Sequence, residues 1–380
     1  MAFAEPMTAA NQRSLLALGR AMVLAQEEFN LILVRCNYQD LRLEMVAALR
    51  AWFAEEGEPS LRESTAAATD TVEPWYALPL PADGVDLFQL LRQAYREHHP
   101  PALMVWGFEG VTDLKALVEG ANQVRDEFRR DLPLPIVLWM SDRSLQTLTR
   151  LAPDFKSWAA MSIQFELSLR ESIAFWWEAT EHLFKSLLEA GVGAFLPNEA
   201  LGLAPGCRLR QELEAAQQSV HTTPVSGATW QFILGRDAYA AGDWGGAIAH
   251  YQQSLEVWSQ GQGYWSPQAA PLALPINRTP DNPFLDQKGL LLFHLALCTN
   301  AQAAQNPTPQ EAQGARDPEM LWQATRNYLA ASWEIFTLRS REDLAAQLLI
   351  HWGHVLVQQQ DWLSLQSLVN YSETLTLIQT

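Results

Sequence analysis

Residues 230–258 read WQFILGRDAYAAGDWGGAIAHYQQSLEVW, and they decide the fold of the second half of the chain. Apolar side chains recur at helical spacing on both sides of a Gly-Asp turn at 242–243. Beyond the turn, Ala247, Tyr251 and Ser254 are four and three residues apart, so they share one face of a helix. The stretch therefore predicts two helices packed together across a tight turn.

This pattern resembles the tetratricopeptide repeat, a helix-turn-helix unit of about 34 residues. Two weaker copies follow, around residues 292–331 and 349–372. The first and last copies share a spacing of eight residues between a glycine and the aspartate of the turn, Gly235 to Asp243 and Gly353 to Asp361. The resemblance implies an array of about three repeats over residues 229–380, which is the smallest number expected to be stable. Such arrays do no chemistry and bind other proteins.

Composition limits the classes of function. The chain has 380 residues, of which 48% are hydrophobic and 18% charged, and its formal net charge is −17. This length suggests two domains with cores of their own. Nucleic acid and anionic lipid both need positive protein surface, so we expect neither as a partner. The sequence has no apolar run long enough to span a membrane and no signal-peptide pattern, which predicts no membrane insertion and a cytoplasmic location.

The cysteines and histidines offer little chemistry. Cys36, Cys207 and Cys298 are far apart and form no C-x-x-C pair, which fits a reducing compartment without a zinc or disulfide framework. Cys36 follows an expected strand, where a nucleophile could stand, but no histidine is near in sequence and an inert buried thiol is favoured. His351 and His354 are three residues apart and could share a metal ion, but no third ligand is apparent, so we expect no metal.

The first half of the chain alternates short apolar runs with helical patterns. Strands are expected at residues 29–34, 102–108 and 135–140. Helices are expected at residues 12–27, 41–53, 85–97, 112–130 and 142–151, and residues 55–84 should form a loop. Continuous apolar strands between helices predict a three-layer α/β domain over residues 1–165, with a small, mostly parallel sheet covered on both faces.

The second half has no convincing strand, so the predicted fold class is α/β plus all-α. A helical connector is expected over residues 166–228, with helices at 166–190 and 209–220 and a linker at 222–228. Two stretches interrupt the repeats. Residues 260–287 are rich in proline and should run extended along one edge of the array, and residues 302–319 form a polar insertion.

The strand order of the first half, the apolar strand LPIVLW at 134–139 and the following APDFKSW at 152–158 resemble the nucleotide-binding core of STAND-type signalling ATPases. This resemblance covers residues 20–165, and members of that family often carry tetratricopeptide arrays at their C-terminus. A phosphate-binding loop reads G-x-x-x-x-G-K-[ST], because backbone amides and a lysine must hold the phosphates. Here residues 35–42 read RCNYQDLR, without glycine or lysine, and the strand at 104–106 is followed by one glutamate and no aspartate for magnesium. We therefore expect a domain that has kept the fold and lost the chemistry, with no enzyme activity and no cofactor.

Three residues of this segment, Arg35, Asn37 and Arg42, could retain anion or nucleotide binding. The alternative is that they are solvated side chains at the start of a helix. Asp142 follows the third strand, where it could sense a ligand. Because Ser141 and Asp142 open a helix, N-capping explains Asp142 more simply.

The repeat resemblance also implies which residues face the groove of the array. The inner helices would present Phe232, Arg236 and Tyr239, then Asn300, and then Gln347 and His354. This set lacks the paired lysine and asparagine with which repeats of this family hold a C-terminal carboxylate. It therefore implies recognition of an internal segment or a folded surface. Tryptophan is favoured at binding hot spots, which adds Trp244, Trp258 and Trp333 as candidates.

We therefore expect a cytoplasmic adaptor or assembly scaffold that binds a protein partner through the groove. The alternative is a signalling switch that senses nucleotide by binding it without hydrolysis. Repeat arrays usually end in a polar capping helix, and none is expected after the helix at 363–377. Its apolar residues must be covered by the connector, by a partner or by a second copy in a homo-oligomer: Leu365, Leu368, Val369, Leu375 and Leu377.

Overall fold

A computed structural model describes residues 7–56, 73–218, 223–259, 284–305 and 318–379. The chain divides into two compact units, Met1–Arg170 and Glu171–Thr380. Most of the proline-rich stretch, residues 260–283, and most of the polar insertion, residues 306–317, lie outside the described residues.

Unit 1 (Met1–Arg170) is built on a five-stranded sheet in the order β2-β3-β4-β1-β5, and every strand pair in it is parallel. The strands are β1 Asn30–Arg35, β2 Tyr76–Pro79, β3 Leu103–Trp106, β4 Pro135–Met140 and β5 Ala159–Gln164. All six residues of β4 are buried, because helices cover both faces of the sheet. A parallel sheet of this kind needs a crossover helix between successive strands, and the sequence supplies them.

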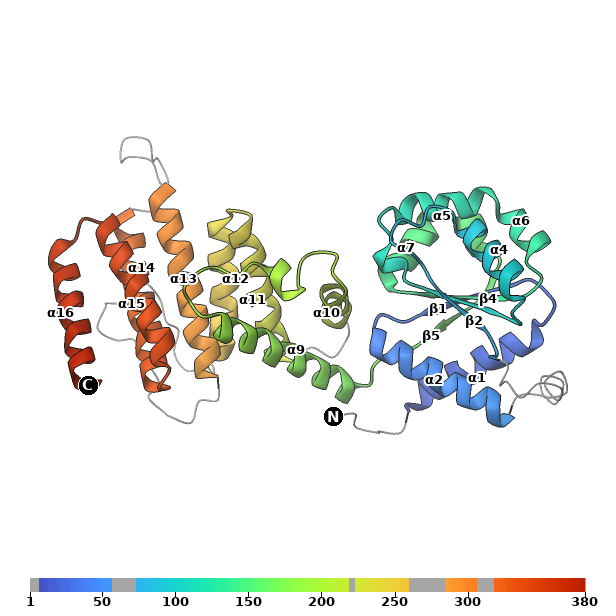
Figure 1. Ribbon diagram of the computed structural model, residues 1–380, viewed down its shortest axis with the longest axis horizontal. Coiled ribbons are helices and arrows are strands. Elements are labelled where there is room, and N and C mark those ends of the chain that lie inside the picture. Colours follow the sequence, from blue (N-terminus) through green and yellow to red (C-terminus); the bar gives the residue numbers. More distant parts are fainter. Residues whose placement is uncertain (1–6, 57–72, 219–222, 260–283, 306–317, 380) are drawn as a thin grey trace. The chain divides into compact units, whose positions relative to one another are not determined.

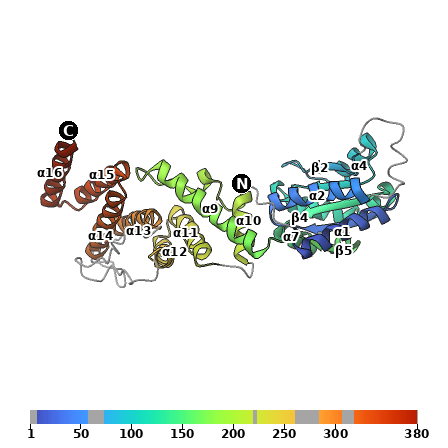
Figure 2. The same ribbon diagram turned by 90° about the horizontal axis from the view of Figure 1, so that it is seen from below.

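The helices of unit 1 form two layers, one on each side of the sheet (Figure 1). One layer holds α1 Ala9–Leu24 and α2 Gln39–Glu56, on the side seen in Figure 2. The other holds α4 Leu87–His98, α5 Leu114–Gln123, α6 Arg125–Asp131, α7 Asp142–Leu151 and α8 Pro153–Ser157. Leu31 and Leu33 of β1 belong to the core cluster of this second layer. The three-layer α/β architecture expected from the sequence is confirmed.

Two strands, and the division of one helix into two, were not expected from the sequence. The strand β2 lies in the expected loop at residues 55–84, and β5 directly follows Trp158. Both are edge strands with weak signals, because β2 is four partly exposed residues that end in proline and β5 reads AAMSIQ. The helix expected at 112–130 is divided at Val124 into α5 and α6.

Unit 2 (Glu171–Thr380) contains only helices among its described residues. They are α9 Leu169–Ala190, the short η2 Asn198–Leu201, α10 Arg208–Gln218, α11 Pro224–Ala240, α12 Trp244–Trp258, α13 Leu285–Gln305, α14 Pro318–Leu338, α15 Glu342–Gln358 and α16 Trp362–Gln379. The expected linker at 222–228 was wrong from Pro224 onward. Thr223 and Ser226 form a capping box at 3.1 and 2.8 Å, and Pro224 occupies the first turn, so this segment starts α11.

Successive helices pair closely at glycines. A Cβ added to Gly235 of α11 would lie 2.6 Å from the ring of Tyr251 on α12. A Cβ added to Gly289 of α13 would lie 2.9 Å from Phe336 on α14. Neither helix pair has room for a side chain at its glycine, so backbone packs directly against a ring.

Three of the turns between helices share one geometry. The residues Gly242, Ser340 and Gln360 have φ angles of +78°, +54° and +57°. In each turn, the next residue donates its N–H to the carbonyl five residues earlier, at 2.9, 2.8 and 3.0 Å. This is the hydrogen bonding of a Schellman helix end. Asp243 and Asp361 then accept from the backbone N–H three residues on, at 2.9 and 3.1 Å, and so start the next helix.

Candidate functional site

The strand order of unit 1 creates a switch point between β1 and β4. The chain leaves β1 for the far edge strand β2, returns through β3 to β4, and then passes β1 to reach β5. The helix after β1 (α2) and the helix after β4 (α7) consequently lie on opposite faces of the sheet (Figure 1). In open parallel sheets, ligands bind beyond the carboxyl ends of the strands at such a point.

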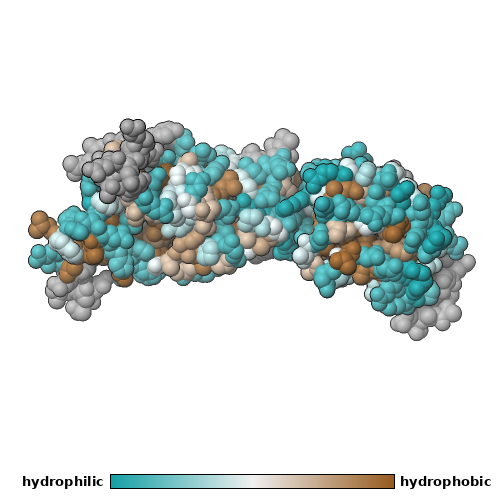
Figure 3. Space-filling model, turned by 90° about the horizontal axis from the view of Figure 1, so that it is seen from above, coloured by the Kyte–Doolittle hydropathy of each residue, from teal (hydrophilic) through white to brown (hydrophobic). Residues whose placement is uncertain are grey.

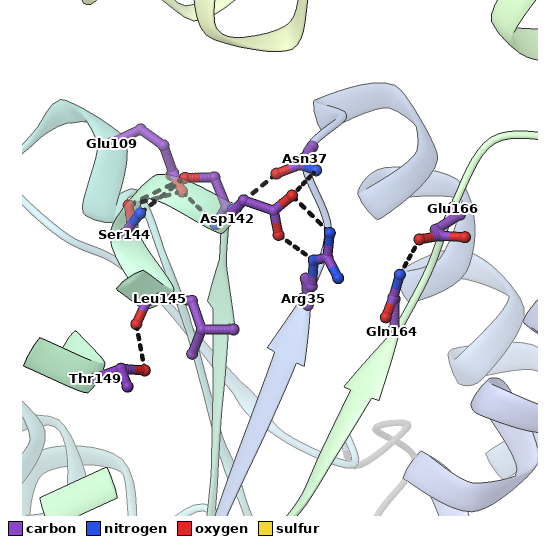
Figure 4. A network of polar contacts seen from close by, with 10 residues as sticks. Arg35, Asn37, Glu109, Asp142, Ser144, Leu145, Thr149, Gln164 and Glu166 are labelled. Carbon is purple, nitrogen blue, oxygen red and sulfur yellow. Dashed lines mark hydrogen bonds and ion pairs between the residues drawn. The ribbon is translucent and has the colours of Figure 1, made fainter. Parts of the chain in front are cut away.

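This switch point is bridged by the chain's own side chains (Figure 4). Arg35, at the end of β1, donates from Nε to Oδ1 of Asp142 and from Nη2 to Oδ2 of Asp142 at 2.7 Å. Asn37 donates from Nδ2 to the same carboxylate at 2.9 Å and accepts from the Asp142 backbone N–H at 2.8 Å. The hydrogen bond to Asp142 raises the pKa of the Arg35 guanidinium, despite partial burial. A bidentate pair of this kind fixes the relative orientation of the two side chains.

Asp142 is therefore not the N-cap of α7. The cap is Ser141, whose hydroxyl accepts from the Ser144 N–H at 3.3 Å. Glu109, which follows β3, supports this cap by accepting from the Ser141 N–H at 2.8 Å. The carboxylate of Asp142 is left to bind Arg35 and Asn37, which the adjacency of Ser141 and Asp142 in the sequence could not show.

The predicted anion-binding residues are only partly brought together. Arg35 and Asn37 meet, but both are engaged by Asp142, which would repel a phosphate. Arg42 lies one turn into α2, with its guanidinium carbon 5.8 Å from the ring centroid of Trp106. The buried thiol of Cys36 donates to the Tyr38 carbonyl at 3.3 Å. These contacts stabilise the loops at the carboxyl ends of the strands.

In unit 2, the structure corrects the predicted groove at its centre. Phe232 and Arg236 do not face an open groove, because both are fully buried. Arg236 donates from Nε to Oδ1 of Asn198 at 2.8 Å and from Nη2 to the carbonyl of Leu196. Its Nη1 lies 3.1 Å from Nε2 of His294.

The chain's own segment at residues 191–198 occupies this face. The ring of Phe195 lies 4.5 Å from the ring of Tyr239, and the Val192 N–H donates to Oε1 of Gln347 at 2.7 Å. The segment therefore touches α11 and α15, and its contact with His294 adds α13. Three residues predicted to hold a partner (Arg236, Tyr239 and Gln347) instead hold this segment.

Burial controls the charges of this network. Desolvation lowers the pKa of Arg236 to about 10. Burial lowers the pKa of His294 well below its usual value, and the positive charge of Arg236 lowers it further. Because an arginine only donates, neutral His294 must accept through Nε2 and carry its proton on Nδ1. A proton added to His294 would place two cations together in the interior.

The other predicted residues have separate environments. His354 is exposed, and half-buried Asn300 donates to the Gln358 side chain at 3.2 Å. Of the tryptophan candidates, Trp258 is fully buried, and half-buried Trp244 donates to Gln305 at 2.9 Å. Trp333, by contrast, lies in the wall of a cleft.

That cleft lies between α14, α15 and α16 and has a volume of about 560 Å³. Its walls include Trp333 and Glu334 of α14, Leu349, Trp352 and Leu356 of α15, and Leu363 and Leu368 of α16. Leu363 is 82% exposed. Apolar surface is visible at this end of the array (Figure 3). The sequence signal for it was the apolar content of the last helix, which predicted Leu368 but neither Trp352 nor Leu363.

The described part of the chain shows neither a metal-binding group of side chains nor a helix suited to span a membrane. Within it, no three His, Cys, Asp or Glu side chains are grouped so that they could hold a metal ion. His351 instead packs on Phe293, with ring centroids 5.2 Å apart. None of the helices searched there combines the length and the apolar character needed to cross a membrane.

No protein-family model, no curated protein and no solved structure matches this chain. The resemblances to tetratricopeptide repeats and to STAND-type ATPases therefore stay predictions.

Proposed function

We propose that this chain is a non-catalytic protein-binding adaptor or assembly scaffold, and that its helical unit binds a partner in the cleft between α14, α15 and α16. The cleft is the observation that carries the proposal. Seven of the ten lining residues that the structure describes are apolar. Apolar surface in water is unfavourable by about 25 cal/mol per Å², so a partner that covers it gains affinity.

The repeated construction of unit 2 supports the same function. Glycine crossings join α11 to α12 and α13 to α14, and one turn geometry recurs at Gly242, Ser340 and Gln360. We interpret these pairs as tetratricopeptide-type repeats whose inner face is filled by residues 191–198. Stacked helix pairs typically present surfaces to other proteins. On this interpretation, the surface left for a partner is at the α14–α16 end.

Unit 1 has a structural role in this proposal. Its switch point holds an arginine–carboxylate pair where a nucleotide-binding domain needs bare amides and a lysine. Isothermal titration calorimetry of the full chain with Mg·ATP and Mg·GTP should give no heat of binding. A binding isotherm that disappears in Arg35→Ala would instead support the nucleotide-sensing alternative.

The proposed function is tested by comparing two exposed apolar positions. Leu363 lines the cleft, whereas Ile350 of α15 is 60% exposed and does not line it. We expect Leu363→Glu to abolish capture of a specific partner from lysate, measured by quantitative mass spectrometry. Ile350→Glu should retain the partner, and both variants should melt as the wild type does. Equal capture by wild type and both variants would refute a role for the cleft.

A further inference from the structure

We propose that the occupant of the cleft is an amphipathic helix of a partner protein, which fills the cleft with apolar side chains and places a lysine or arginine against Glu334. This inference rests on the proposed function and names the partner's chemistry. Three features of the cleft carry it: the spacing of its lining residues, the hydrogen bonding of its walls and its one unpaired charge.

The spacing fits a helix. Along α15, Leu349, Trp352 and Leu356 are three and four residues apart and form one ridge, in which Leu349 and Trp352 are half-buried and Leu356 is buried. At 1.5 Å per residue this ridge is about 10 Å long, or two helical turns. Trp333 on α14 and Leu368 on α16 form the opposing walls. A helix whose apolar residues recur with the same spacing can lay its own ridge into this groove.

The hydrogen bonding of the walls disfavours an extended segment. The lining consists of side chains on three helices, whose backbone groups are already bonded within each helix. Among the described lining residues, Ser364 and Ser367 alone carry hydroxyl groups. An extended peptide would bring unpaired N–H and C=O groups into an apolar cleft, which is unfavourable. A helix satisfies its own backbone.

The negative charge of Glu334 favours a cationic side chain on the partner. Among the described residues of the lining, Glu334 is the only charged one, it is half-buried, and its carboxylate has no hydrogen-bond or ion-pair partner among the described residues. The described arginines closest to Glu334 in sequence are already paired: Arg326 with Glu319 at 3.1 Å, Arg339 with Asp286 at 3.2 Å and Arg341 with Asp343 at 3.1 Å. A carboxylate in an apolar wall attracts a cation and repels an acid.

The same charge argues against a second copy as the occupant. The chain carries a formal charge of −17, so a second copy would bring further acidic surface to Glu334. A partner helix with a basic residue has the complementary sign.

Fluorescence anisotropy with the full chain tests the inference. The probes are three labelled amphipathic peptides of about 18 residues, long enough to form a helix. They share one stripe of leucines and differ only in whether Lys, Gln or Glu stands beside it. We expect the Lys peptide to bind about two- to five-fold more tightly than the Gln peptide, and the Glu peptide to bind most weakly. The preference should shrink as salt is raised.

Matched variants locate the effect. Glu334→Gln should remove the preference for the Lys peptide, and Glu334→Lys should reverse it. Glu256→Lys, an equal charge change at an exposed site on α12, should leave the order unchanged. A proline at the centre of the Lys peptide should prevent binding, because it breaks the helix.

The outcomes separate this inference from the proposed function. Failure of the Lys peptide to bind, or equal binding of all three peptides, overturns the inference. So does a dimer in light scattering that Leu363→Glu dissociates, since the occupant would then be a second copy. In each of these cases, loss of partner capture in Leu363→Glu would still support an adaptor that uses the cleft. Capture that ignores Leu363→Glu refutes the proposed function itself.

Discussion

Replacing Gly235 with alanine is expected to destabilise the helical unit, although alanine is the better helix former. The new Cβ would lie 2.6 Å from both Cδ1 and Cε1 of Tyr251 and 3.1 Å from Cζ. Carbon atoms in favourable contact are about 3.5–4.0 Å apart. The methyl group would therefore overlap the ring by about an ångström, so either the ring or the helix must move.

The surroundings of Tyr251 leave the ring little freedom. It is fully buried, with ring centroids 5.6 Å from Phe232 and 5.4 Å from His294. Overpacking of this kind costs about 1–3 kcal/mol. The higher helix propensity of alanine offsets about 0.5–1 kcal/mol of that loss. We expect the free energy of unfolding of the helical unit to fall by about 0.5–2 kcal/mol, and by more for Gly235→Leu.

Gly227 provides the matched control, because it lies in the same helix and a Cβ added to it would meet nothing within 4 Å. Gly227→Ala should therefore leave stability unchanged or raise it by up to about 1 kcal/mol. Hydrogen exchange of peptides from α11 and α12, followed by mass spectrometry, measures both changes locally. If Gly235→Ala protects these helices as well as Gly227→Ala does, the close crossing with Tyr251 does not exist.

Three further predictions concern the polar networks. The unfolding free energy of the helical unit should fall as the pH drops below 6.5, by about 1.4 kcal/mol per pH unit. The reason is that His294 binds a proton in the unfolded chain at this pH, whereas buried His294 in the folded chain stays neutral until its lowered pKa is reached. His294→Gln should flatten this pH dependence in urea titrations. Asn198→Leu removes an acceptor from buried Arg236 and should cost about 2–3 kcal/mol, and a change in the urea midpoint within error would contradict the network. Asp142→Ala should cost only about 1 kcal/mol, because its pair with Arg35 is partly exposed, and a double-mutant cycle of the two should give coupling of that size.

Local patterns predicted the elements whose signals are strong. The bounds of β4 and α7 match the expected ranges at 135–140 and 142–151, because one is a continuous apolar run and the other starts at a serine cap. The edge strands β2 and β5 were not predicted, because their pairing depends on neighbours that lie far along the chain. Propensity alone does not specify such strands.

The close helix crossing at Gly235 agrees with the two packed helices that residues 230–258 predict, since a glycine within a helical pattern signals close packing. The direction in which Arg236 points was not readable. Helical periodicity assigns residues to a face of a helix, but it does not say what covers that face. In this protein the cover is residues 191–198, which lie about forty positions earlier and reach Arg236 only in the folded chain.

By itself, then, the sequence determined an α/β sheet domain, an array of helices after it, and the absence of a phosphate-binding loop, because each follows from short-range patterns of apolar, turn and charged residues. Only the tertiary structure decided which polar residues bind one another within the fold and which apolar residues remain exposed. Arg35 meets Asp142, and Arg236 meets Asn198, through contacts between segments distant in sequence. The cleft between α14, α15 and α16 likewise depends on how three helices pack, which periodicity along any one of them does not contain.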